Sequence, residues 1–198
     1  MKTRLPGRQT AKVLLDADAI DRTLSRIAHE LIERTPDLDS LALVGIHTRG
    51  VPIAARLRNL VAARSGVDVH LGALDITFHR DDVGVRHGAA PLHEQPVVRG
   101  TALDFELEGM TVVLVDDVLY TGRTIRAAID ALLEYGRPKR VQLAVLVDRG
   151  HRELPIRPDY VGKNLPTALS ERVHVQLLEV DEADNVLLVT PIPEDDDA

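Results

Sequence analysis

Short apolar runs recur along the chain at the intervals expected of alternating strands and helices. Residues 41–46, 112–115 and 141–147 are apolar at nearly every position and rich in Val, Leu and Ile. That pattern predicts strands that are buried on both faces, as in a parallel sheet. Runs at 173–178 and 186–189 predict two further strands nearer the carboxyl terminus.

Apolar residues at helical spacing predict helices between these strands. One helix is expected from Asp16 to the residue before Pro36, since a proline biases its predecessor away from helix. A second is expected to open at Pro52 and end near Gly66, and a third to follow Gly122. Strands that alternate with helices predict an α/β fold with a mainly parallel central sheet flanked by helices on both faces.

Residues 79–100 show neither the alternation of apolar and polar residues expected of a strand nor the apolar spacing expected of a helix, and they are rich in charged residues, glycine and proline. A segment of this length inside one domain predicts a flexible functional loop. The flanking stretches 67–78 and 103–107 alternate apolar and polar residues, so they are expected to form the arms of a hairpin, with a bulge near Gly72. Residues 159–167 are expected to form a second loop.

The composition fits a single globular domain spanning residues 1–198, in which 44% of residues are hydrophobic and 28% charged. Cysteine is absent, and no apolar run approaches the roughly 20 residues of a membrane span. A cytoplasmic protein without disulfides is therefore expected. The net charge of −7 and the 3% aromatic content disfavour indiscriminate nucleic-acid binding, but not a local basic patch. Residues 1–10 are expected to form a loose basic tail, and residues 191–198 an acidic one.

The candidate chemistry lies in residues 112–124, where the apolar run ends in two carboxylates and a glycine loop then opens a helix. Backbone N–H groups of Thr121–Thr124, aided by the helix dipole, can hold a phosphate. Asp116 and Asp117 can accept hydrogen bonds from vicinal ribose hydroxyls. Since the spacings of nucleoside triphosphate and dinucleotide loops are both absent, the segment predicts a site for a phosphorylated sugar. The alternative is an ordinary surface turn with solvated acids.

Two arginines are candidates for a pyrophosphate site. Arg49 follows a predicted strand, at the sheet edge where open α/β sheets bind ligands, and a guanidinium matches phosphate oxygens with paired donors. An isolated loop arginine is more often a surface charge, but the adjacent Gly50 favours a function. Arg80 stands at the base of the long loop, where closure would bring it over a leaving pyrophosphate; the alternative is one more solvated charge.

Residues 112–124 resemble the phosphoribosyl pyrophosphate (PRPP) motif of type I phosphoribosyltransferases. Together with residues 21–30, 43–50, 75–77 and 142–157, they resemble the PyrR family of bifunctional pyrimidine-operon attenuation regulators and uracil phosphoribosyltransferases. The resemblance implies a type I phosphoribosyltransferase fold with a flexible hairpin loop and a small hood. It also implies binding of pyr messenger RNA in response to uridine nucleotides, and conversion of uracil and PRPP to UMP and pyrophosphate.

The same resemblance implies roles for individual residues. The catalytic set is Arg49, Arg80, Asp116 and Asp117. The PRPP-binding set is Thr48, Arg49, Gly50, Asp116, Asp117, Val118, Leu119, Tyr120, Thr121, Gly122, Arg123 and Thr124. The set for uracil or UMP is Asp148, Arg149, Tyr160 and Val161. Mg²⁺ is expected to arrive with PRPP, and no structural metal is expected because no cluster of ligands has metal-binding spacing.

Two positions distinguish this chain from related purine salvage enzymes. Those enzymes commonly place an aspartate where this chain has Tyr120, and a purine-reading lysine where it has Asp148. Hypoxanthine and guanine are therefore expected to fit poorly, while a carboxylate or a backbone carbonyl could accept the N3–H of uracil. The family comparison also implies that Tyr160 lies against the base and that the Val161 backbone reads its edge.

The RNA contacts are expected on two basic groups outside the phosphate motif. A patch suited to RNA phosphates and loop bases would form if folding brought both groups onto one face; the alternative is two solvated ridges. A dedicated uracil salvage enzyme and a sensor that only binds nucleotide remain the competing functions, and the resemblance implies a homodimer or homotetramer. The two groups comprise Arg22, Ser25, Arg26, His29 and Arg34 in the first, and His151, Arg152, Arg157 and Lys163 in the second.

Overall fold

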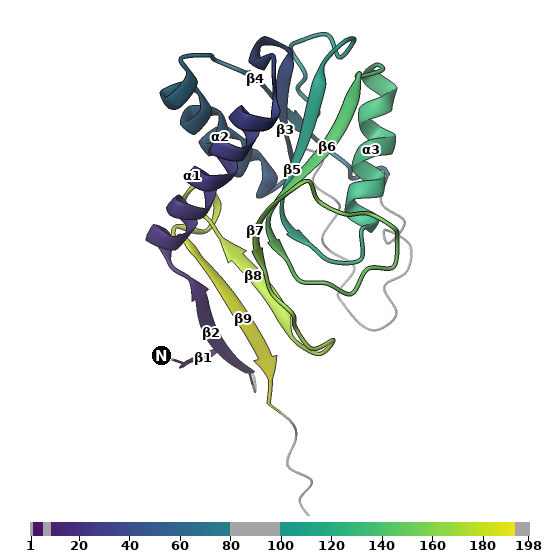
Figure 1. Ribbon diagram of the computed structural model, residues 1–198. Coiled ribbons are helices and arrows are strands. Elements are labelled where there is room, and N and C mark those ends of the chain that lie inside the picture. Colours follow the sequence, from purple (N-terminus) through teal and green to yellow (C-terminus); the bar gives the residue numbers. More distant parts are fainter. Residues whose placement is uncertain (1, 6–8, 80–99, 193–198) are drawn as a thin grey trace, which may run out of the picture.

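The computed structural model describes residues 2–5, 9–79 and 100–192, which form two sheets (Figure 1). The larger sheet has five parallel strands in the order β4-β3-β5-β6-β7. This arrangement confirms the mainly parallel central sheet predicted from the apolar runs. Its strands are β3 (Leu41–Ile46), β4 (His70–Leu74), β5 (Thr111–Leu119), β6 (Arg140–Asp148) and β7 (Tyr160–Asn164).

Helices cover both faces of this sheet, as predicted. Helices α1 (Ala17–Arg34) and α2 (Gly50–Ser65) lie on one face, and α3 (Arg123–Tyr135) lies on the other (Figure 1). Because neighbouring strand residues point to opposite faces, β5 contributes to two cores. Val113 packs with the residues of α1 and α2, whereas Leu114 packs with those of α3.

A second, antiparallel sheet forms the hood expected from the family resemblance. Its strand order is β1-β2-β9-β8, and it lies below the parallel sheet in Figure 1. The segment between β8 and β9, residues 177–184, contains the short helix α4 (Leu178–Asp181) and is called the connector below. The strands are β1 (Lys2–Leu5), β2 (Gln9–Leu15), β8 (Arg172–Gln176) and β9 (Asn185–Pro191).

Three local predictions were wrong. The expected tail at 1–10 contains β1 and the start of β2, because β9 supplies a distant pairing partner. The expected loop at 159–167 contains β7, a short edge strand whose polar residues hide any period. The expected hairpin is reduced to β4 and a single bridge between Ala73 and Ala102. Predictions for residues 80–99, including Arg80, and for 193–198 lie outside the described residues.

Candidate functional site

The two acids of the central motif lie within β5 rather than after it, because the strand continues to Leu119. Asp116 is buried, and one of its carboxylate oxygens accepts a hydrogen bond from the Asp117 backbone N–H at 2.9 Å. The Asp117 carboxylate accepts one from the Val118 N–H at 2.8 Å. Burial raises the pKa of Asp117, although hydrogen bonding with the Asp116 side chain and the Val118 N–H and the positive charge of Arg49 oppose the rise. The two carboxylates are thus held rigidly at the carboxyl end of the central strand.

The start of α3 provides a site for an anion. Gly122 occupies the cap position in the left-handed conformation, with φ +94°, which glycine adopts without strain. Gly122 has no side chain to cap the helix, and Thr121 Oγ1 accepts only a long hydrogen bond, 3.3 Å, from the Arg123 N–H, so the first-turn N–H groups can turn to a bound anion. The Thr121 carbonyl accepts hydrogen bonds from the Glu153 and Leu154 N–H groups at 3.0 and 3.1 Å, and these fix the loop in place.

The turn from β3 to α2 brings Arg49 to the same end of the sheet. Gly50 is buried, and a Cβ there would lie 2.2 Å from the Val115 carbonyl oxygen, so only glycine lets α2 start this close to β5. The peptide between His47 and Thr48, just before it, is cis. The hydrogen-bonded carboxylate of Asp181 raises the pKa of Arg49, and the charge of Asp117 raises it further. The structure therefore brings Arg49 and the acidic pair together, as the sequence predicted.

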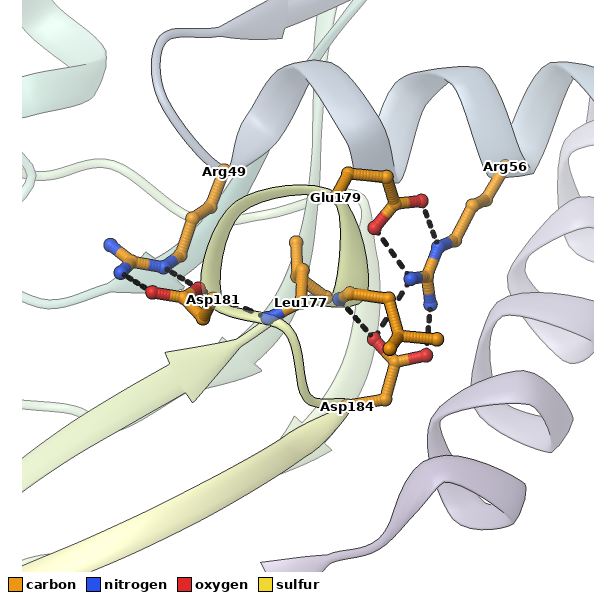
Figure 2. A network of polar contacts seen from close by, with 7 residues as sticks. Arg49, Arg56, Leu177, Glu179, Asp181 and Asp184 are labelled. Atoms are coloured by element: carbon orange, nitrogen blue, oxygen red, sulfur yellow. Dashed lines mark hydrogen bonds and ion pairs between the residues drawn. The ribbon is translucent and has the colours of Figure 1, made fainter.

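Arg49 also has a partner that sequence reasoning missed. Its Nε and Nη2 atoms donate to the two Asp181 oxygens at 3.0 and 2.6 Å (Figure 2). Asp181 belongs to the connector, which lies against α2 and is fastened there by Arg56 through Glu179 and Asp184. The run of acids at 179–184 was the signal available in the sequence, but nothing local indicated which cations it would meet.

A second part of the candidate site surrounds Asp148, at the end of β6. One carboxylate oxygen accepts from the Gly150 N–H at 2.9 Å, and the other pairs with Arg152. Arg152 donates further to the carbonyls of Tyr120 at 2.8 Å and Ile156 at 3.0 Å. This arginine therefore ties the loop after β6 to the phosphate motif, an internal role that its predicted place among the RNA residues did not suggest.

A cavity of about 440 Å³ opens beside Asp148. Two of the four residues predicted to contact uracil, Asp148 and Val161, line it. It offers a carboxylate, a backbone strand and apolar walls, which suits a small planar base with polar edges. The complete lining is Asp148, Gly150, Arg152, Arg157, Pro158, Val161, Asn164, Leu165 and Pro166.

The prediction for the Tyr160 side chain was wrong. Its ring is fully buried in the core beneath α1, with the Arg34 guanidinium 5.4 Å from its centroid. Consecutive strand residues face opposite sides, so Val161 faces the cavity while Tyr160 faces the core. The ring therefore cannot lie against a base.

Arg149 also points away from the cavity. It is buried, lies 4.1 Å from the centroid of the Tyr120 ring and donates to the Glu171 carbonyl at 2.8 Å. Its side chain holds Tyr120 and the turn before β8 in place. Only its backbone remains available for the contact with uracil that the sequence analysis expected.

The first basic group proposed for RNA contacts β7, the strand that carries Lys163 of the second group. From α1, Arg26 donates to the Val161 and Gly162 carbonyls at 2.8 and 2.7 Å, and Arg34 to the Asp159 carbonyl at 3.1 Å. Exposed Lys163 continues the same strand. The rest lie on α1 or on the loop after β6. On α1, Ser25 accepts a hydrogen bond from Arg64, His29 pairs with Glu33, and Arg22 is exposed. On the loop after β6, His151 is hydrogen-bonded to the Thr167 carbonyl, and Arg157 lines the cavity.

Metal-binding and membrane-spanning features also bear on the class of site. Within residues 2–5, 9–79 and 100–192, no group of three or more His, Cys, Asp or Glu side chains is placed to hold a metal ion. Over the same ranges, every helix is too short or too polar to cross a membrane.

Comparison with known proteins gives consistent matches along the chain. The phosphoribosyl transferase domain family matches residues 11–182. The bifunctional protein PyrR of Clostridioides difficile is 55% identical over 175 residues, covering 88% of this chain and 96% of that protein. That of Deinococcus deserti is 57% identical over 175 residues, covering 88% and 92%. A hypoxanthine phosphoribosyltransferase structure from Staphylococcus aureus shares the fold, with a TM-score of 0.65 and 20% identity over 92% of this chain and 93% of that one.

Proposed function

Because the chain belongs to the phosphoribosyl transferase domain family and, within it, to the PyrR proteins, we propose that it transfers the phosphoribosyl group of PRPP to uracil and regulates pyrimidine genes by binding pyr messenger RNA. This membership confirms the family and the type I phosphoribosyltransferase fold expected from the sequence. One observation carries the enzymatic proposal: two segments far apart in the sequence bring Arg49, the acidic pair and the start of α3 to one end of the sheet.

Each part of this constellation has a task in the transfer. The N–H groups of Thr121–Thr124 hold the 5′-phosphate, and Asp116 and Asp117 accept the ribose hydroxyls. Arg49 balances the charge of the pyrophosphate as its bond to the ribose C1 breaks and the bond from uracil N1 forms. The transition state carries positive charge on the ribose, so the protein acts mainly by positioning and charge neutralisation.

The residues present fit Mg²⁺ carried by the substrate. Mg²⁺ prefers oxygen ligands and is often held by one or two carboxylates together with substrate phosphates. Asp116 and Asp117 supply two carboxylates at this end of the sheet. When bound, the ion would neutralise the charge of the pyrophosphate.

Base selection is proposed to lie at the Asp148 cavity. Arg152 and the Gly150 N–H keep Asp148 in place as a hydrogen-bond acceptor, and a carboxylate oxygen can accept the N3–H of uracil. Turnover of PRPP with uracil, hypoxanthine and guanine tests this assignment. Uracil is expected to be the preferred base, and guanine used as well as uracil would refute it.

The RNA site is proposed along α1 and β7, since Arg26 and Arg34 place the basic face of α1 against the strand that carries Lys163. The test is affinity for a pyr leader hairpin with and without UMP, over a salt series. Tighter binding with UMP, with a steep salt slope, is expected of a nucleotide-sensing regulator that contacts phosphates. Absence of binding in both conditions would leave a dedicated uracil salvage enzyme, the second candidate.

Substitution of exposed residues separates the two activities. Arg22→Ala combined with Lys163→Ala should weaken RNA binding and lower its salt slope by about 1 for each phosphate that the protein no longer neutralises. Uracil turnover should be unchanged. We also propose a homodimer or homotetramer, which sedimentation equilibrium would distinguish from a monomer.

A further inference from the structure

The connector between β8 and β9 is held to α2 by two arginines that differ in exposure. Arg49 and Arg56 are seven residues apart, two helical turns, so both face the connector (Figure 2). Arg56 donates to both Glu179 and Asp184, and its side chain is 18% exposed, with Asp184 at 8%. Among the described residues Arg49 pairs with Asp181, and the two side chains are 35% and 17% exposed. Arg56 therefore holds the connector through two carboxylates, one of them, Asp184, nearly buried, whereas the described partner of Arg49 is a single carboxylate.

The Arg49–Asp181 pair uses the donors that a pyrophosphate would need. A carboxylate and a phosphate both present two oxygens to one edge of a guanidinium, and the edge formed by Nε and Nη2 accepts only one of them at a time. Asp181 occupies that edge, at 3.0 and 2.6 Å. Arg49 stands directly before α2, at the same end of the sheet as the acidic pair on β5, so the competition takes place beside the candidate PRPP site.

Asp181 can release Arg49 without being left unsatisfied. One of its oxygens also accepts the Leu177 N–H at 3.1 Å, and Arg56 still fastens the connector on either side of it. The exchange therefore replaces one anion on Arg49 by another while the hood stays attached. Arg49 and Asp181 each keep a partner during this exchange. The exchange therefore avoids leaving a buried charge unpaired, which is what makes breaking an ion pair costly.

We propose that Asp181 is an internal competitor for pyrophosphate: it occupies Arg49 in the unliganded protein, and the pyrophosphate of PRPP displaces it. This proposal rests on the proposed function, which assigns pyrophosphate to Arg49. It makes Asp181 a determinant of PRPP affinity that lies in the hood, outside the phosphate motif.

The experiment measures pyrophosphate and PRPP binding by calorimetry in Asp181→Asn and in Glu179→Gln. Both substitutions remove one negative charge from the connector, but only the first frees Arg49. Asp181→Asn is expected to bind both ligands about 2- to 5-fold more tightly, or about 0.4–1 kcal/mol at 1.4 kcal/mol per tenfold. The KM for PRPP should fall by a similar factor while the KM for uracil is unchanged, and Glu179→Gln should bind as the wild type does.

Three results would overturn the proposal. Unchanged or weaker binding in Asp181→Asn would make Asp181 a support for Arg49. Equal tightening in Glu179→Gln would reduce the effect to general charge. Tightening that persists in an Arg49→Ala background would show that Asp181 acts elsewhere. Asp181→Ser provides a second variant if Asp181→Asn folds poorly.

Failure of the proposed function is seen separately. If wild-type protein did not turn over uracil, the function would fail, yet pyrophosphate binding would still report on the competition. If the wild type turned over uracil and Asp181→Asn bound pyrophosphate no more tightly, only the competition would fail.

Discussion

Replacing Gly50 with alanine tests whether α2 must start against β5. An added Cβ would lie 2.2 Å from the Val115 carbonyl oxygen, whereas ordinary contact begins at 3.4 Å. Since the obstacle is backbone, the start of α2 must retreat by about 1 Å. Arg49 precedes Gly50 and moves with it, away from Asp117. A misplacement of that size costs about 100-fold in rate, so kcat/KM for PRPP should fall about 100-fold.

The assay varies PRPP at saturating uracil and is paired with a thermal melt. Overpacking should also cost about 1–3 kcal/mol of stability, and each kcal/mol lowers Tm by about 2–4 °C in a chain of this size. Gly72→Ala, on β4, is the control, because its added Cβ would meet chiefly the end of the Leu103 side chain, at 2.6 Å, and would reach the nearest backbone atom, the Ala102 carbonyl oxygen, only at 3.1 Å. That side chain can move, so kcat/KM should stay within about twofold of the wild type.

Two outcomes would refute the reasoning. If Gly50→Ala kept at least a third of the wild-type kcat/KM, the close approach of α2 to β5 would not be needed for catalysis. If Gly72→Ala lost as much activity, the loss would reflect general destabilisation and not the displacement of Arg49.

The remaining predictions concern charged residues. Burial raises the pKa of Asp117, so the ionised form of this residue destabilises the fold at neutral pH. The Asp117→Asn variant should therefore melt at a higher temperature than the wild type at pH 7, and this gain in Tm should shrink towards pH 3. Its turnover should nevertheless fall at least about tenfold. Hydrogen bonds from Arg56 and Arg49 lower the pKa values of Glu179 and Asp181 respectively; their ion pairs stabilise the fold at neutral pH and are lost as the pH falls below about 4. Urea unfolding between pH 7 and 3 should therefore show a smaller loss of stability in a Glu179→Gln/Asp181→Asn variant, and an equal loss would contradict this. Arg152→Lys removes the guanidinium that bonds Asp148 and the carbonyls of Tyr120 and Ile156 at the same time. The KM for uracil should therefore rise about tenfold, along with any loss of RNA affinity. An unchanged KM for uracil would mean that Arg152 acts on RNA binding alone.

Local signals were sufficient for the phosphate end of the site. The apolar run, the acids and Gly122 lie within thirteen consecutive residues, and each acts through backbone geometry that neighbouring residues determine. Asp16 caps α1 through the Ala19 N–H at 2.9 Å, as its position before a helical period predicts. Arg49 was also placed correctly, because the carboxyl ends of parallel strands meet at one edge of a sheet.

The features that were missed depend on distant segments. β2 forms against β9, more than 170 residues away, and neither sequence shows that partner. Tyr160 and Val161 point to opposite faces, but which one faces the core depends on how β7 joins β6, and five residues with a glycine and a lysine carry no such signal. Asp181 reaches Arg49 only because the hood folds back onto α2.

The contact of Arg26 with β7 bears on how the protein avoids aggregation. β7 is the last strand of its sheet, and an unpaired strand edge is a template on which another chain can add a strand. By donating to the carbonyls of the consecutive residues Val161 and Gly162, which alternate in direction along a strand, Arg26 occupies a backbone acceptor that an incoming strand would need. A variant made to weaken RNA binding at Arg26 would thus also uncover this edge, and its solubility would need checking before any loss of affinity is assigned to RNA.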